Sequence, residues 1–67
     1  MWTIIGHDAP PCVIYLQKGE SIKVLRKPTF NEWANAYTIG VFLKVEDDRL
    51  DDLNPNEKAY LEKHRCR

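Results

Sequence analysis

The amino-acid sequence predicts a small α+β fold, in which an antiparallel sheet is combined with two helices. Three observations support this prediction. Runs of β-branched, aromatic and aliphatic residues fill much of the first half of the chain, and two of these runs flank a glycine, as in a β-hairpin. After Pro28, apolar residues recur at helical spacing. Close to the C-terminus, Asn54 and Pro55 have the order of a helix cap and a first helical residue.

Three strands of the sheet are predicted in the N-terminal half of the chain. Residues 2–5 read Trp-Thr-Ile-Ile, a composition typical of a strand. Residues 7–11 are expected to form a loop, because the two prolines in this stretch fix φ and lack a backbone donor. Residues 12–17 and 21–27 flank Gly19 and are predicted to pair as a hairpin.

The first helix is predicted at residues 30–37. Thr29 stands three residues before Glu32, which is the spacing of a capping box. Four apolar residues then fall at positions i, i+3, i+4 and i+7, and we expect the face that they form to pack on the sheet. These residues are Phe30, Trp33, Ala34 and Tyr37.

A fourth strand and a second helix complete the predicted fold. Residues 39–45 alternate between apolar side chains on one face and Phe42 on the other, which suggests that the second face is also partly covered. The C-terminal helix is predicted at residues 55–65, and the basic residues of its last turn suit the helix dipole. The residues expected to face the core from this segment are Leu53, Tyr60, Leu61 and His64.

An SH3-like small barrel with a C-terminal helix is the alternative fold. Residues 18–25, Glu32-Trp33 and Gly40-Val41-Phe42 have a spacing loosely similar to that of small SH3-like barrels. Whether residues 29–37 form a helix or a strand decides between the two folds.

The length of 67 residues corresponds to a single domain, residues 1–67. A chain of this size buries only roughly 60% of the surface that it exposes when unfolded. Its core therefore leaves little room for a deep pocket with stable walls. We predict that the chain is not an enzyme, that it needs no cofactor, and that it binds another macromolecule. A core of marginal size is also compatible with a homodimer.

Ten basic and ten acidic residues give a formal net charge of zero. Nucleic-acid-binding domains are usually clearly basic, so the composition favours a protein partner. No stretch approaches the roughly 18 apolar residues of a membrane span, and the N-terminus lacks the pattern of a signal peptide. Two cysteines are too few for a secreted disulfide scaffold. We expect a cytoplasmic protein without membrane contact.

Residues 46–53 carry five acids against one base, Arg49. The acids include adjacent pairs and no glycine separates them, unlike the acids of a calcium-binding loop. A solvated turn into the last helix is the structural interpretation. The functional interpretation is an acidic surface that docks on a basic surface of a partner protein. We call the following residues the acidic segment: Glu46, Asp47, Asp48, Asp51 and Asp52.

The predicted function is that of a small protein-binding regulator or inhibitor, of the compact type that phages and mobile elements encode. The acidic segment would contact the partner, and Trp2, if exposed, would add an aromatic contact at the interface.

A small nucleic-acid-binding domain is the alternative function. Its surface would combine the basic residues of the hairpin with an aromatic side chain on which bases stack. Charged residues on a sheet edge also prevent edge-to-edge pairing, so a purely structural role explains the same residues. They are Lys18, Lys23, Arg26 and Lys27.

A redox or hydrolytic enzyme centred on Cys12 is the second alternative. No second cysteine lies close enough in sequence to act as its resolving thiol. The histidines and cysteines together are the candidate ligands of a zinc ion, but their spacing differs from the tight ligand pairs of common zinc modules. We therefore predict no metal site, and free thiols rather than a Cys12–Cys66 disulfide. The four candidate ligands are His7, Cys12, His64 and Cys66.

Overall fold

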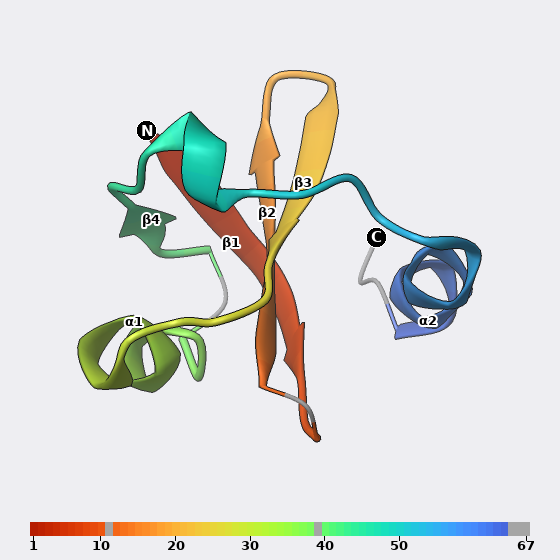
Figure 1. Ribbon diagram of the computed structural model, residues 1–67, viewed down its shortest axis with the longest axis horizontal. Helices are drawn as coiled ribbons and strands as arrows, with labels where there is room; N and C mark the ends of the chain where they lie inside the picture. The colour runs from red at the N-terminus through yellow and green to blue at the C-terminus, as the bar shows by residue number, and fades with distance from the viewer. Residues whose placement is uncertain (11, 39, 65–67) are drawn as a thin grey trace.

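The computed structural model describes residues 1–10, 12–38 and 40–64. In chain order, its elements are β1 (Trp2–Asp8), β2 (Val13–Lys18), β3 (Ser21–Leu25), α1 (Phe30–Asn35), β4 (Phe42–Leu43), the short 3-10 helix η1 (Asp47–Arg49) and α2 (Pro55–His64). The strands form one antiparallel sheet in the order β3-β2-β1-β4, and α1 and α2 lie on opposite sides of it (Figure 1). The sheet is open, and the predicted small α+β fold is confirmed.

Strand β2 is the centre of the fold, because both of its faces are buried. Each of its first four residues is at most 4% exposed. Val13 and Tyr15 pack with Leu61 of α2, whereas Ile14 and Leu16 belong to the hydrophobic cluster on the α1 side. A strand that is covered on both faces has a continuous apolar run instead of an alternating one. This burial explains the sequence Val-Ile-Tyr-Leu.

Strand β1 contains a β-bulge that reverses the alternation of its side chains. Its register against β2 shifts between Ile4 and Gly6. Before the shift, Ile4 lies in the cluster on the α1 side. After the shift, Gly6 faces Leu61 of α2, and the ring of His7 packs against Trp33 of α1. Because side chains alternate along a strand, the same strand without the bulge would turn His7 toward α2.

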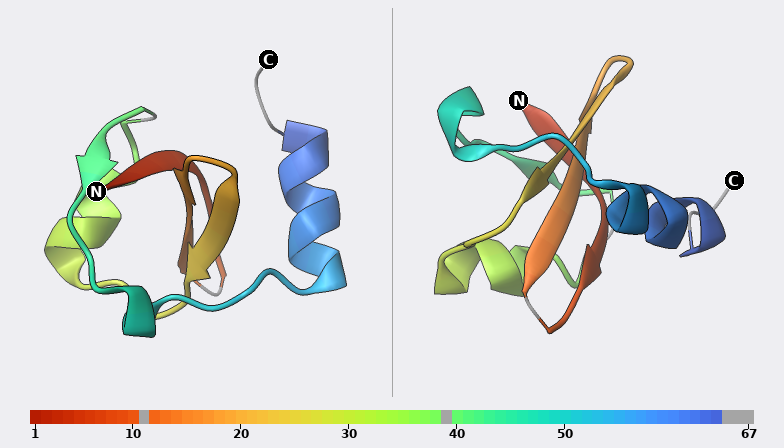
Figure 2. Two further views of the ribbon diagram at one scale, coloured as in Figure 1. Left: turned by 90° about the horizontal axis from the view of Figure 1, so that it is seen from above. Right: turned by 45° about the vertical axis from the view of Figure 1, so that its right-hand side comes forward.

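The segment after η1 crosses the edge of the sheet and takes the chain from one side to the other (Figure 2). Leu50 packs in the cluster on the α1 side, and Leu53 packs against the cluster on the α2 side. Between them, Asp51 pairs with Val24 of β3 through two backbone hydrogen bonds of 3.0 Å. This bridge covers part of the β3 edge, whose backbone groups are otherwise open to another strand.

Strand β1 is longer than predicted. The sequence predicts a strand that ends at residue 5 and a loop at residues 7–11. β1 continues to Asp8 instead, because its backbone pairs with β2 as far as Val13. The hairpin of β2 and β3 is confirmed, with Gly19 in its turn at a φ of 63°.

Strand β4 is shorter than the predicted strand 39–45. It covers Phe42 and Leu43, and Ile39 lies outside the described residues. Gly40 has a φ of 93°, a left-handed conformation that interrupts the extended backbone ahead of β4. Leu43 faces the core as predicted, but Phe42 is 63% exposed, so the expectation of a covered second face is wrong here.

Helix α1 begins as predicted but does not pack as predicted. The capping box at its N-terminus is present, and the helical conformation favours the α+β fold over the SH3-like alternative. The predicted apolar face is largely exposed: Phe30 is 84% and Tyr37 is 66% accessible to solvent. The helix ends at Asn35, two residues before the predicted end. Trp33 packs against the core, and the C-cap residue Ala36 lies in it.

Helix α2 packs on the other face of the sheet, and three of the four residues predicted to face the core from this segment do so. His64 is exposed, so its predicted place in the core is wrong. Leu61 is buried, and Leu53 and Tyr60 pack against the same cluster. The ring of His64 lies 4.4 Å from the ring of Tyr60. The predicted cap is confirmed, because Oδ1 of Asn54 accepts a 2.7 Å hydrogen bond from a backbone amide of the first turn. Among the described residues, no helix is long and apolar enough to cross a bilayer.

Two glycine-to-alanine substitutions should change stability in opposite directions. A Cβ at Gly6 would meet Leu61 and Tyr15 at 3.6 Å, an ordinary van der Waals distance. Gly6→Ala should therefore stabilise the fold by about 0.4–1 kcal/mol, because alanine restricts the unfolded chain. Gly19 has a φ of 63°, so Gly19→Ala should destabilise the fold by about 1–2 kcal/mol.

Urea denaturation followed by tryptophan fluorescence measures both changes. Unfolding midpoints that move in the same direction for the two variants would contradict the described backbone of β1 or of the hairpin turn.

Candidate functional site

Trp2 lies in the core and not on a binding surface. Its side chain is 5% exposed and packs in the cluster on the α1 side. The indole N–H donates a 3.1 Å hydrogen bond to Oδ1 of Asp47 in the acidic segment. Trp2 shares the phase of Ile4 along β1, and this phase turns both side chains inward. Trp2 is therefore not the exposed interface residue that the sequence suggested.

The acidic segment does not form one continuous acidic surface, because part of it is paired with the basic residues of β3 and its flank. Oδ2 of Asp51 lies 3.2 Å from Nη1 of Arg26. Oδ1 of Asp52 accepts a hydrogen bond from Nζ of Lys23. Two acids and two bases from the patches that the sequence presents as separate binding surfaces thus pair with each other at the β3 edge.

Arg26 also connects the crossing segment with helix α2. Its Nε and Nη2 donate to the two carboxylate oxygens of Glu57, at 3.2 and 2.8 Å. Nη2 also donates to the backbone oxygen of Asp52 at 3.1 Å. Bidentate arginine–carboxylate pairs are strong and geometrically specific. This contact therefore fixes the first turn of α2 relative to β3.

The ion pairs shift the pKa values of their carboxyl groups. The hydrogen bond from Arg26 is the main cause of a lowered pKa for Glu57, although partial burial acts in the opposite direction. The hydrogen bond from Lys23 likewise lowers the pKa of Asp52. Both groups favour the ionised state in the folded protein, so their contribution to stability depends on pH.

Arg49 forms a second bidentate pair, between η1 and α1. Its Nη1 and Nη2 donate to the carboxylate oxygens of Glu32 at 2.7 and 2.9 Å. The hydrogen bond from Arg49 is the largest cause of the lowered pKa of Glu32. Glu46 and Asp48 are the members of the acidic segment that are exposed and whose side chains take no part in the hydrogen bonds and ion pairs of the described residues.

The basic residues of the hairpin are also partly engaged within the fold. Lys23 and Arg26 form the ion pairs described above. Nζ of Lys18 lies 5.8 Å from the centre of the Trp2 ring, within the range of a cation–π contact. Lys27 is exposed. The surface predicted for nucleic acid is thus reduced to Lys18 and Lys27 as cations without a carboxylate partner among the described residues.

The histidines and cysteines do not come together in the described part of the chain. The ring of His7 packs among the aromatic residues on the α1 side, whereas the ring of His64 packs on α2. Cys12 is exposed in the turn between β1 and β2. Cys66 lies outside the described residues, and so does the Cys12–Cys66 pairing. Among residues 1–10, 12–38 and 40–64, no group of three or more metal-ligating side chains gathers.

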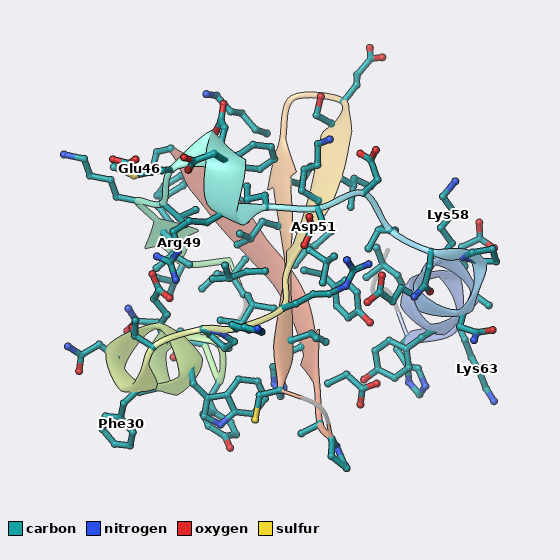
Figure 3. All side chains as sticks on the ribbon, in the orientation of Figure 1. Phe30, Glu46, Arg49, Asp51, Lys58 and Lys63 are labelled. Atoms are coloured by element: carbon teal, nitrogen blue, oxygen red, sulfur yellow. The ribbon has the colours of Figure 1, made fainter. Side chains whose placement is uncertain are left out.

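Helix α1 carries an exposed aromatic surface that the sequence analysis placed against the sheet. Phe30 is 84% exposed and projects from α1 away from the sheet (Figure 3). Tyr37, just beyond the helix, is 66% exposed. The half-buried ring of Trp33 lies 5.7 Å from that of Tyr37 in an edge contact. We call these three residues, Phe30, Trp33 and Tyr37, the α1 aromatic surface.

His7 supports the α1 aromatic surface from strand β1. Its ring centre lies 5.6 Å from that of Trp33 and 5.2 Å from that of Tyr37. Its backbone oxygen accepts a 2.9 Å hydrogen bond from the hydroxyl of Tyr60 in α2. The bulge in β1 makes this possible, because it places the His7 ring on the α1 side.

The sequence does contain a signal for this surface, namely the scarcity of charge. Residues 30–38 include one charged residue, Glu32, in a chain in which 30% of the residues are charged. Helical spacing identifies an apolar face but does not say whether the sheet or another molecule covers it. Spacing alone therefore misplaced the surface.

Comparison of the chain with models of known protein families, with curated protein sequences and with solved structures gave no match.

The Arg26–Glu57 pair predicts a loss of stability in acid. The pKa of Glu57 is lowered from its usual value of about 4.5 in the folded protein. The stabilisation is therefore complete above that value and is lost as the pH falls through the folded pKa. Glu57→Gln should lower the unfolding free energy at neutral pH and flatten its fall as the pH drops below about 5.

Urea denaturation at a series of pH values measures this effect. Glu46→Gln is the matched control, because it removes the same charge from an exposed position outside the ion pairs. If Glu57→Gln retained the pH profile of the unmodified protein, the Arg26–Glu57 contact would not have the strength that its geometry indicates.

Proposed function

We propose that this chain is a small protein-binding domain, and that its partner docks on the α1 aromatic surface. The exposure of Phe30 (84%) and Tyr37 (66%) is the observation that carries the proposal. Burial of a side chain such as phenylalanine supplies about 1.5–3 kcal/mol, and aromatic residues dominate the energy of many protein interfaces. A partner that covers α1 gains this energy.

The lack of charge on this surface defines the chemistry of the partner. Glu32, the one charged residue in this stretch, is bound by Arg49. Charged residues are depleted in the core of protein interfaces, whereas aromatic residues are enriched. We therefore propose that the partner offers an apolar, uncharged cleft that receives one side of α1. The exposed residues of this stretch are Phe30, Asn31, Ala34, Asn35, Tyr37 and Thr38.

Two of the three residues of the α1 aromatic surface, Trp33 and Tyr37, are also held in place before a partner arrives. The rings of His7, Trp33 and Tyr37 contact one another with centres 5.2 to 5.7 Å apart. Edge contacts between aromatic rings are favourable in themselves. Side chains that are already ordered lose less conformational entropy on binding, so more of the contact energy appears as affinity.

This proposal keeps the role of a regulator or inhibitor and moves the docking surface from the acidic segment to α1. The internal pairing of Asp51 and Asp52 supports the move, since paired acids attract a basic partner less strongly. The nucleic-acid alternative draws less support for the same reason, because Lys23 and Arg26 already have carboxylate partners.

A quantitative capture experiment tests the proposal. The tagged chain is compared with the double variant Phe30→Ala/Tyr37→Ala for the proteins that it retains from a lysate, after nuclease treatment and in about 0.5 M salt, which screens exposed charges. The double variant should retain at least about ten-fold less of a stoichiometric partner than the unmodified chain, equivalent to about 1.4 kcal/mol of binding free energy.

Phe42→Ala is the matched control, because Phe42 is a similarly exposed aromatic residue (63%) on β4. The control variant should capture the partner as well as the unmodified chain does. Equal losses in all variants, or a partner that nuclease or salt removes, would contradict docking through α1.

A further inference from the structure

A groove lies between helix α2 and the hairpin of β2 and β3. Helix α2 lies on the side of the sheet opposite α1 (Figure 1). Its volume of about 480 Å³ is within the range of roughly 300–1,000 Å³ that is usual for ligand pockets. We call it the α2 groove. Its lining combines an apolar floor with charged walls, and the two parts together define what fits into it.

The floor of the α2 groove is apolar and continuous with the core. It consists of Ile22 from β3, Leu53 from the crossing segment and Leu61 from α2. All three pack in or against the cluster that contains Tyr15 and Val24. An aliphatic chain laid on this floor removes further apolar surface from water and extends the core outward.

The walls of the α2 groove carry carboxylates from two different elements. Glu20 stands in the turn of the hairpin, and Glu62 stands on α2. Both are exposed, and neither takes part in the ion pairs of the described residues. Asp52 forms an ion pair with Lys23. Lys58 is the basic residue that lines the groove. With Asp52 neutralised in this way, the groove keeps two carboxylates against one ammonium.

We propose that the α2 groove binds an arginine side chain, carried by a flexible apolar segment of a partner protein. The aliphatic stem of the arginine lies on the apolar floor, and its guanidinium reaches the carboxylates of Glu20 and Glu62. Long basic side chains combine an apolar stem with a charged end in this manner. Arginine fits better than lysine, because its planar fork of donors bridges carboxylates and is less strongly hydrated.

The α2 groove is independent of the proposed docking at α1. The two surfaces lie on opposite sides of the sheet and differ in chemistry, since one is uncharged and the other is acidic at its walls. A basic partner was also the expectation drawn from the acidic segment, but Asp52 is the one residue that this segment shares with the groove. Binding in the groove should weaken in salt, whereas docking at α1 should not.

Amide chemical shifts of the ¹⁵N-labelled chain test the proposal directly. The probe is the blocked tripeptide acetyl-Leu-Arg-Leu-amide, and its matched control carries citrulline, which has the same shape without the charge. The arginine peptide should shift the amides of Ile22, Leu53 and Leu61 and bind at least about five-fold more tightly than the citrulline peptide, equivalent to about 1 kcal/mol. Equal binding of the two peptides, or shifts confined to other elements, would overturn the proposal.

A pair of charge-matched variants tests whether Glu20 and Glu62 are the residues that recognise the arginine. Glu20→Gln/Glu62→Gln should abolish the preference for arginine over citrulline. Glu46→Gln/Asp48→Asn removes the same charge from η1 and the residue before it, and should leave the preference intact. If both double variants lost the preference equally, the net charge of the chain and not the groove would be responsible.

Lys58→Gln gives a second test that does not depend on removing an acid. It takes away the cation that competes with the arginine, so the arginine peptide should bind more tightly, by about two-fold or more. Unchanged or weaker binding would count against the groove. Phe30→Ala/Tyr37→Ala should not alter peptide binding, which separates failure of this proposal from failure of docking at α1.

Discussion

The crossing of the chain over the β3 edge is the constraint on which the rest of the structure depends. The backbone bridge between Asp51 and Val24 fixes the crossing segment on β3. Arg26 connects this segment with α2 through its hydrogen bonds to Glu57. Without this passage, α2 could not reach the face of the sheet that contains Tyr15. A chain of 67 residues has little apolar surface to bury. Hydrophobic contact is non-directional and does not fix the orientation of α2. The bidentate Arg26–Glu57 pair does, because its geometry is specific.

The sequence predicts those features that depend on neighbouring residues. The hairpin around Gly19 and the helix caps at Thr29 and Asn54 are local, and the structure contains all three. Features that depend on distant residues were missed. The bulge in β1 reflects the fit of β1 against β2 and α2, and no residue type marks it. The orientation of α1 depends on Ala36, whose burial only the assembled sheet determines.

The candidate sites differ from the prediction for one physical reason. In a small chain with equal numbers of acids and bases, oppositely charged side chains lie close enough to pair within the fold. Lys23 and Arg26 accordingly form ion pairs with acids of the crossing segment. These charged side chains therefore connect elements of the fold, while aromatic rings such as that of Phe30 are exposed to solvent. Both proposed surfaces follow from this arrangement of paired charges and exposed aromatic rings. The α1 aromatic surface is uncharged, and the α2 groove retains carboxylates that the internal pairs do not reach.

The two edges of the sheet have a consequence for the order in which the chain folds. Strands β1, β2 and β3 form a meander from consecutive residues, and contacts of this kind form quickly. Part of the β1 edge is covered by β4, and part of the β3 edge by Asp51, both from later in the chain. A meander of β1, β2 and β3 without these later residues therefore has two open edges. Open edges pair readily with other strands, so the chain is most exposed to aggregation while β4 and Asp51 are not yet paired with the meander.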